Sequence, residues 1–245
     1  MTYPENLQNI LNKIAERRTL VGVQRATPYQ LDMEQALMMM EMIGKARNPK
    51  FVIDEHNRWT YAQIIKWLYA DDTMECIDVD AASQKKIVTT PGRLTAGLYI
   101  AGATGTGKSW AMELLNIFAD IDSPKITLGS ETQTIHFACY RAEDIWEEAT
   151  SSDSGMAKFK TMPILCIQDL GSEPVSDAVR MGTRREPLRQ IIEARGDRNN
   201  LVTLITSNFS ITSPEIENRY TDRVTSRLRG MCNYLIINGP DRRLW

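Results

Sequence analysis

The clearest chemical pattern in the sequence is the run GATGTGKS at residues 102–109, which Trp110 follows. Its glycines allow the backbone to curl so that successive N–H groups point at phosphate oxygens. A helix is expected to begin here, and its N-terminal dipole favours the same anion. Lys108 adds a compact cation for the β- and γ-phosphates, and Ser109 offers a hydroxyl to Mg²⁺. The run therefore predicts a site for ATP and Mg²⁺, formed by Gly102, Ala103, Thr104, Gly105, Thr106, Gly107, Lys108, Ser109 and Trp110.

A second pattern is the apolar run ILCIQDLG at residues 164–171, which ends in polar residues. In ATP-hydrolysing proteins, an apolar strand that ends in acids holds the Mg²⁺ hydration shell and orients the attacking water. Two registers fit. In the first, Gln168 stands where the metal-linked acid belongs and Asp169 polarises the water. In the second, Asp169 is the metal-linked acid and Glu173 serves nearby. A neutral amide replaces a carboxylate poorly, so either hydrolysis is slow or Asp169 has both roles.

Two further polar groups follow in chain order. Asn208 ends an apolar strand, where its side chain could project beside the γ-phosphate; the alternative is a strand-terminal turn in which Asn208 caps the next segment. Arg223 and Arg227 are four residues apart and share a helix face. From that face a guanidinium could reach the γ-phosphate held by a neighbouring subunit. The alternative is ion pairing at the surface with nearby acidic residues.

The elements that position these residues alternate between short apolar runs and amphipathic helices, starting after Pro91 and Gly92. This alternation predicts a parallel sheet covered by helices on both faces, a three-layer α/β domain over residues 86–245. The preceding residues 1–85 predict a small helical region. The expected strands span residues 97–102, 134–140, 163–171, 200–209 and 233–240. The expected helices span residues 1–20, 30–46, 109–121, 142–150, 184–197 and 214–231, and one more helix starts from Thr60. Residues 151–160 are expected to form a loop.

The composition bounds the functional classes. The formal net charge is −2, but the chain from Arg180 onward holds twelve arginines, no lysine and seven acids. Such a segment suits phosphate recognition, and equally a salt-bridged surface. The four cysteines include no C-x-x-C pair, so neither a zinc site nor a disulfide framework is expected. No signal-peptide core and no long apolar run is present, so we expect a cytoplasmic protein without a membrane span.

Taken in order, these motifs resemble the AAA+ ATPases of the DnaC and IstB type, which include helicase loaders and ATPase partners of transposases. The resemblance covers about residues 86–245 and is most specific in DLGSE and RVTSRL. It implies Walker A roles for Lys108 and Ser109, a Walker B role for Asp169 and a sensor role for Asn208.

The same resemblance implies roles for three further arginines. Arg227 matches the arginine finger that acts on a neighbouring subunit, with Arg223 close to it. Arg243 would sense phosphate near the C-terminus, although Arg242 is equally well placed by spacing. The sequence departs from the family at Gln168, and we expect no large C-terminal helical lid.

The resemblance implies an ATP-dependent loader that binds a replicative helicase and DNA, single-stranded rather than duplex, and assembles as a spiral, filament or ring. One alternative is a transposition regulator that coats duplex DNA and recruits a transposase. A second is a nucleotide-binding scaffold with little turnover, which Gln168 motivates. The arginine-rich motif disfavours a small-molecule kinase. Residues 1–85 would dock the partner, or their aromatic residues Trp59, Tyr61, Trp67 and Tyr69 would form a helical core.

Overall fold

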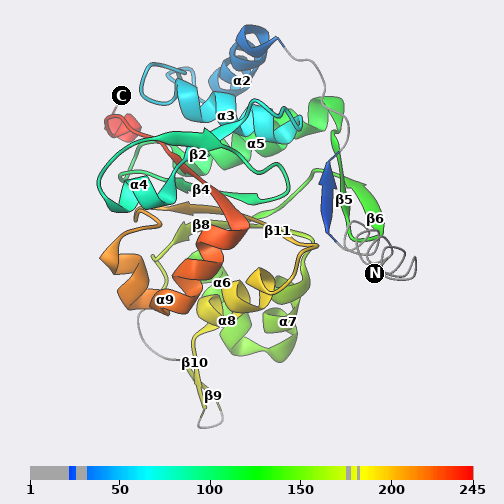
Figure 1. The fold of residues 1–245 in the computed structure, drawn as a ribbon, viewed down its shortest axis with the longest axis vertical. Helices are drawn as coiled ribbons and strands as arrows, with labels where there is room; N and C mark the ends of the chain where they lie inside the picture. Colours follow the sequence, from blue (N-terminus) through cyan, green and yellow to red (C-terminus); the bar gives the residue numbers. More distant parts are fainter. Residues whose placement is uncertain (1–21, 26–31, 175–177, 181–182, 245) are drawn as a thin grey trace, which may run out of the picture.

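The computed structural model describes residues 22–25, 32–174, 178–180 and 183–244. The helix expected within residues 1–20 lies outside these ranges. Figure 1 shows a central sheet with one group of helices above it and another below. The predicted three-layer α/β architecture is therefore confirmed.

The central sheet has five parallel strands in the spatial order β12-β4-β11-β8-β7. A parallel strand covered by helices on both faces buries side chains on both faces, which explains why these runs are mainly apolar. Every residue of β4 and of β11 is buried. The strands are β4 Gly97–Ala101, β7 Cys139–Arg141, β8 Ile164–Leu170, β11 Val202–Ser207 and β12 Cys232–Ile236.

Two apolar cores lie on opposite faces of this sheet. Along β4, Leu98 and Ile100 belong to one core and Tyr99 to the other, as the alternation of side chains along a strand requires. The first core is covered by α2 Met33–Arg47, α3 Arg58–Leu68 and α5 Lys108–Asp122. The second is covered by α6 Ala142–Ser151, α7 Asp153–Thr161, α8 Pro187–Gly196 and α9 Pro214–Met231 (Figure 1).

Smaller elements decorate this frame. An antiparallel sheet joins β1 to β5 and β5 to β6, and a second pairs β2 with β3. A third pair, β9 with β10, projects at the foot of the molecule in Figure 1. The bounds are β1 Val23–Arg25, β2 Glu75–Ile77, α4 Val79–Ser83, β3 Thr89–Pro91, β5 Lys125–Leu128, β6 Glu131–Thr134, β9 Ala178–Arg180, β10 Thr183–Arg185 and the 3₁₀ turn η1 Arg242–Leu244.

Three predicted elements differ from the structure. The helix predicted over residues 184–197 begins only at Pro187, because Thr183–Arg185 form strand β10. The single strand predicted over residues 134–140 is split, because β6 ends at Thr134 and β7 begins at Cys139. The loop predicted over residues 151–160 is wrong. Ser152 Oγ accepts a hydrogen bond of 2.9 Å from the Gly155 N–H and caps α7, whose Met156 and Phe159 are buried three residues apart. The helix is short, and its small polar first turn resembles a loop in sequence.

Helix α3 packs on the same core as the helix that follows the glycine run. Trp67 is fully buried and donates its indole N–H to the Ala96 carbonyl at 2.8 Å, and Thr60 Oγ1 donates to the Ile236 carbonyl at 2.6 Å. Tyr61 and Tyr69 are also buried. The aromatic residues of this region are therefore mostly core, and that core is shared with α5. The domain boundary at residue 85 stays a prediction.

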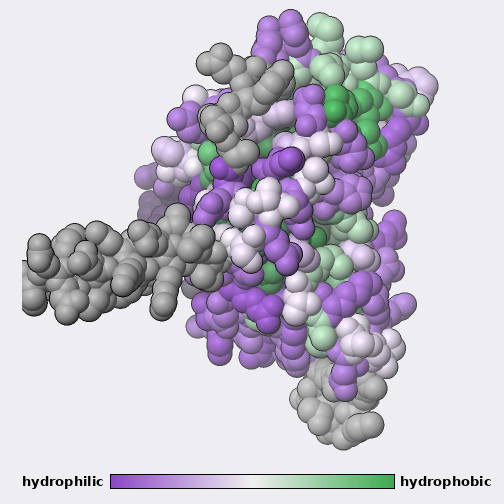
Figure 2. All heavy atoms as spheres, turned by 90° about the vertical axis from the view of Figure 1, so that its right-hand side faces the viewer, coloured by the Kyte–Doolittle hydropathy of each residue, from purple (hydrophilic) through white to green (hydrophobic). Residues whose placement is uncertain are grey.

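The face of the molecule shown in Figure 2 is mostly hydrophilic, and apolar residues gather near its top, at the height of α2 and α5 in Figure 1. Helix α2 exposes three methionines, and the last turns of α5 expose two isoleucines. These residues are Met38, Met39, Met42, Ile117 and Ile121. Among the described residues, no helix is both long enough and apolar enough to cross a bilayer.

Candidate functional site

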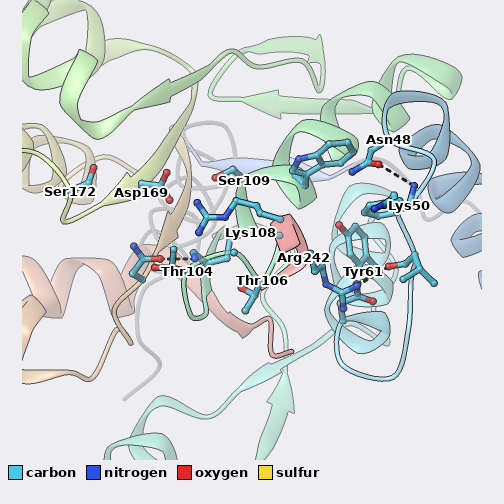
Figure 3. Close-up of a pocket in the computed structure, with 18 of the residues that line it drawn as sticks. Asn48, Lys50, Tyr61, Thr104, Thr106, Lys108, Ser109, Asp169, Ser172 and Arg242 are labelled. Atoms are coloured by element: carbon cyan, nitrogen blue, oxygen red, sulfur yellow. Dashed lines mark hydrogen bonds between the residues drawn. The ribbon is translucent and has the colours of Figure 1, made fainter. Parts of the chain in front are cut away.

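The carboxyl ends of β4, β7, β8 and β11 meet at one edge of the sheet, where parallel strands place the residues that follow them side by side. A cavity of about 480 Å³ lies at this edge (Figure 3). Its walls come from the glycine run, the β8 and β11 ends, the start of α6, the residues between α2 and α3, and η1. The lining residues used below are Asn48, Lys50, Phe51, Val52, Asn57, Tyr61, Thr104, Lys108, Ser109, Trp110, Asp169, Ser172, Asn208, Arg242 and Arg243.

The glycine run forms the floor of the cavity between β4 and α5. Gly107 has φ of 99° and is the N-cap of α5, a left-handed backbone that glycine adopts without a steric penalty. Residues 104–110 all line the cavity, whereas Gly102 and Ala103 lie before the lining segment. Because α5 begins at Lys108, its free N–H groups and its dipole favour an anion in this cavity. The arrangement fits the predicted phosphate site.

Lys108 is buried and already aimed by two acceptors. Its Nζ donates to the Ala103 carbonyl at 2.9 Å and to Asn208 Oδ1 at 2.7 Å. Burial lowers the pKa of Lys108, and Asp169 partly opposes this effect. Asn208 follows β11, so the structure brings together the two residues that the sequence placed in separate motifs. A bound phosphate would replace these two neutral acceptors as the hydrogen-bond partner of the ammonium, because hydrogen bonds between charged groups are stronger.

Asp169 lies in the cavity wall at the end of β8. Its φ is 55°, and its N–H donates to Thr206 Oγ1 at 3.0 Å on the adjacent strand. Gln168 is 7% exposed, does not line the cavity, and its Nε2 has no partner among the described residues. It shares a strand face with Cys166, on the α5 side of the sheet.

Glu173 does not serve the cavity. It is buried at 5% exposure, and its carboxylate is bound by Arg219, Tyr220 and the Gly171 N–H. The register in which Glu173 assists Asp169 therefore has no support in the geometry. Asp169 lines the cavity and Gln168 does not, so Asp169 is the acid of this segment that is placed to serve both the metal and the water.

The donor set at the cavity suits Mg²⁺ held mainly by water and phosphate. Ser109 and Asp169 both line it, and Mg²⁺ usually binds to one or two protein oxygens, substrate phosphates and several waters. No cluster of three or more Asp, Glu, His or Cys residues that could hold a metal on its own occurs among the described residues. The residues present therefore fit a metal that arrives with a nucleotide.

One wall of the cavity comes from residues that the sequence analysis missed. The segment from Asn48 to Val52, with Asn57 and Tyr61, faces the glycine run from the other side. Phe51 stacks on Trp110 with ring centroids 5.6 Å apart and contacts Tyr61 edge-on at 5.9 Å. This wall lies some 50 residues before Lys108 in sequence and carries no motif, so only the fold reveals it.

The two C-terminal arginines both line the cavity but are held differently. Arg242 donates to both carboxylate oxygens of Asp54 at 2.8 Å, and its side chain is 13% exposed. Arg243 is 64% exposed and contacts only the neighbouring Asp241, at 3.2 Å, among the ion pairs of the described residues. The Arg242 N–H also donates to the Gly105 carbonyl at 2.9 Å, which fixes η1 over the glycine run. Arg243 is thus the better placed of the two to turn toward a ligand.

Arg223 and Arg227 do not line the cavity. Both lie on α9, on the opposite face of the sheet from α5. Arg227 pairs with Asp197, and the Arg223 side chain is 62% exposed with Nε 3.8 Å from Glu193 Oε1. The ion-pair partners belong to α8 and the turn after it, not to α9 itself. Neither arginine contributes to its own chain's cavity.

No family model matches the sequence, and no curated protein does. Among solved structures, a proposed primosome component from Streptococcus pyogenes serotype M3 superposes with a TM-score of 0.50 and 19% identity, over 80% of this chain and 87% of that one. The DnaC helicase loader superposes with a TM-score of 0.40 and 22% identity, over 58% and 78%. AMPPCP-bound DnaA from Aquifex aeolicus superposes with a TM-score of 0.45 and 15% identity, over 76% of this chain and 48% of that one. The first of these shows a shared fold, and the two looser superpositions add no weight.

Proposed function

We propose that the chain is an ATPase that binds ATP and Mg²⁺ in the cavity at the sheet edge. The observation that carries this proposal is Lys108, whose buried ammonium is held at the start of α5 between the Ala103 carbonyl and Asn208. An ammonium buried at a helix N-terminus, beneath a glycine loop, is complementary to a triphosphate and to few other groups. The aromatic and amide wall opposite would receive the base.

In the proposed reaction, the side chains at the β8 and β11 ends act on the γ-phosphate. Bound Mg²⁺ would neutralise charge on the β- and γ-phosphate oxygens. Lys108 would hold the same oxygens, Asn208 would orient the attacking water and Asp169 would accept its proton. Gln168 supplies no charge to this centre, so we expect slow turnover. A nucleotide-binding scaffold with almost no turnover is the second candidate, and the neutral, buried Gln168 favours it.

We further propose that hydrolysis needs a second copy of the chain. Arg227 and Arg223 lie away from their own cavity and at least partly exposed, so only a neighbouring copy's nucleotide is within their reach. Repeated head-to-tail contacts of this kind produce a ring or an open spiral. ATP would then join adjacent copies, and its loss would release them.

The proposed role is loading of a replicative helicase onto single-stranded DNA. The shared fold with a proposed primosome component supports a replication role. The hairpin of β9 and β10 projects from the body in Figure 1, and its sequence includes Arg180, Arg184 and Arg185, a composition suited to a polyanionic backbone. The exposed methionines of α2 are flexible apolar groups of the kind found at protein-binding surfaces.

The proposal is tested by titrating the chain with ATP and MgCl₂ in a calorimeter, followed by light scattering with ATP and DNA. We expect one saturable ATP site that Lys108→Ala weakens strongly, and particles larger than a monomer once ATP is present. Fluorescence anisotropy with matched single-stranded and duplex oligonucleotides separates a loader from a transposition regulator that coats duplex DNA. A chain that binds ATP but stays monomeric with every oligonucleotide would contradict the assembly proposal.

A further inference from the structure

Glu173 connects the end of β8 to the first half of α9. Its Oε2 accepts the Gly171 N–H at 3.0 Å, while its Oε1 accepts Arg219 Nε at 3.0 Å and the Tyr220 hydroxyl. Its backbone carbonyl accepts a second hydrogen bond from the Arg219 guanidinium. The Glu173 side chain is 4% exposed and that of Arg219 is 18% exposed. A buried carboxylate needs several donors, and each donor here belongs to one of two segments that carry proposed site residues.

The first segment is the turn from Asp169 to Ser172, which borders the cavity. Asp169 and Gly171 both have positive φ, of 55° and 101°. A Cβ on Gly171 would lie 2.8 Å from the Phe209 ring, so the turn packs closely against the residue after Asn208. The Ser172 N–H donates to the Asp169 carbonyl at 2.9 Å. The left-handed backbone at Asp169 is kept in place by surrounding contacts, and the hydrogen bond from the Gly171 N–H to the Glu173 carboxylate is one of them.

The second segment is the kink of α9. Thr221 interrupts the helix with φ of 74° and ψ of 159°, a conformation that a β-branched residue adopts only under constraint. Arg219 and Tyr220 lie immediately before this kink, and Arg223 and Arg227 lie after it. The kink therefore sets the direction of the helical segment that carries both arginines. The Arg219 and Tyr220 contacts to Glu173 fix where that kink begins.

We propose that Glu173 is a positioning residue that couples the Asp169 turn to the kink of α9, and so to the arginines offered to a neighbouring copy. This inference rests on the proposed ATPase function. A γ-phosphate that moves the Asp169 turn would move the Gly171 N–H against Glu173. Because the carboxylate also holds Arg219 and Tyr220, the displacement would reach the kink. One copy's nucleotide state would thereby set the geometry of the arginines at the next copy's site.

The contact itself can be tested without nucleotide, on the full chain. Hydrogen–deuterium exchange should show amides of residues 169–172 and 222–229 exchanging at least tenfold faster in Glu173→Gln than in the unmodified chain. Residues 108–122 of α5 should exchange at the unchanged rate. Glu148→Gln is the control for loss of a carboxylate elsewhere, because Glu148 lies on α6, away from this network, and pairs with Lys158 of α7 at 3.0 Å. Faster exchange in residues 169–172 alone, with α9 unaffected, would overturn the coupling.

A steady-state assay with ATP then asks whether the contact serves catalysis. Glu173→Gln should lower kcat about tenfold or more with little change in KM, since the glycine loop is untouched. Tyr220→Phe removes a single hydroxyl from the same carboxylate and should give the same pattern with a smaller loss, which also covers a Glu173 variant that folds poorly. Equal losses in kcat and in ATP affinity, or unchanged kinetics in both variants, would overturn the proposal.

The two experiments separate this inference from the proposed function. If the unmodified chain fails to bind ATP, the ATPase proposal fails while the exchange data still judge the coupling. If ATP binds and turns over but Glu173→Gln leaves both exchange and kcat unchanged, the inference fails and the ATPase proposal stands.

Discussion

The glycine loop and helix α9 both present cations, and they hold them in opposite ways. Lys108 is 4% exposed and is aimed by two acceptors of its own chain. Arg223 and Arg227 lie toward solvent on the other face of the sheet, where acidic residues of α8 and the following turn pair with them. The loop is complete within one chain before any ligand arrives. The arginines are not, because neither lines the cavity of its own chain.

This difference teaches how the two regions divide the proposed work. A prearranged ammonium contributes to binding, since little has to be reorganised when the phosphate enters. An exposed arginine contributes little until a second copy buries it against developing charge, where it acts on the transition state. Substitutions in the two regions should therefore change different measured quantities, and four predictions test that division, starting from the largest expected effect.

The largest effect is expected for Arg227→Ala. Loss of an arginine that stabilises transition-state charge typically lowers turnover by about a thousandfold or more. ATP affinity should stay within about twofold, because Arg227 lies outside the cavity of its own chain. Arg229→Ala, which removes an exposed arginine from the same helical segment, is the control for surface charge. Loss of ATP affinity in Arg227→Ala would contradict the division of roles.

The next effect is expected for Lys108→Ala, measured as the ATP dissociation constant by calorimetry. Removal of a charged hydrogen-bond donor costs about 2–3 kcal/mol, which corresponds to roughly a hundredfold weaker binding. Lys66→Ala, on α3 and away from the cavity, should bind ATP normally. Unchanged affinity in a folded Lys108→Ala chain would mean that the phosphates lie elsewhere.

The third prediction concerns Gln168→Asp, which should change turnover and leave ATP binding unchanged. It places a carboxylate at the position that one register of the β8 segment links to the metal, and we expect turnover to rise about tenfold with unchanged ATP affinity. Gln168→Asn, which keeps the group neutral, should give no gain. If Gln168→Asp leaves turnover unchanged in a stable chain, Asp169 alone serves both the metal and the water.

The smallest effect is expected for Asp54→Asn, which loosens the wall opposite the glycine loop. The Asp54–Arg242 pair is partly exposed, so its loss should weaken ATP binding only about two- to fivefold. Burial raises the pKa of Asp54, but hydrogen bonds from Arg242 and the His56 N–H outweigh this and hold the pKa below its usual value. The pair therefore stabilises the fold at neutral pH and loses that contribution as the pH falls through the lowered pKa. The difference in Tm between the two chains should shrink from pH 7 to strongly acidic solution.

The sequence predicted the parts of the site that are local. Residues 102–109 and the apolar β8 and β11 segments carry their own signals, because a phosphate loop and a buried parallel strand each need a particular run of residues. The parallel sheet followed from the alternation of such runs with helices. Shared edges of a parallel sheet then explain why Asp169 and Asn208 meet beside Lys108 in the structure.

The parts that the sequence did not predict depend on distant packing. The wall formed by Asn48, Phe51 and Tyr61 reaches the cavity because α3 shares the core of α5, which no local pattern encodes. The observed role of Glu173 differs from the predicted one because it also depends on residues distant in sequence. Its place four residues after Asp169 suggested a second acid for the site, yet Arg219 and Tyr220, 46 and 47 residues further on, hold it in the interior. The kink at Thr221 is likewise invisible in an amphipathic helical run.

The central claim, that one chain's loop and another chain's α9 complete a single site, is tested most directly by mixing two inactive variants. Lys108→Ala keeps its arginines and Arg227→Ala keeps its glycine loop, so a mixed assembly contains interfaces with both groups intact. In an equimolar mixture, roughly a quarter of head-to-tail interfaces should have this composition. We predict that ATP turnover returns to about that fraction of the unmodified rate on mixing. A mixture that assembles with ATP and remains as inactive as its two components would contradict the account.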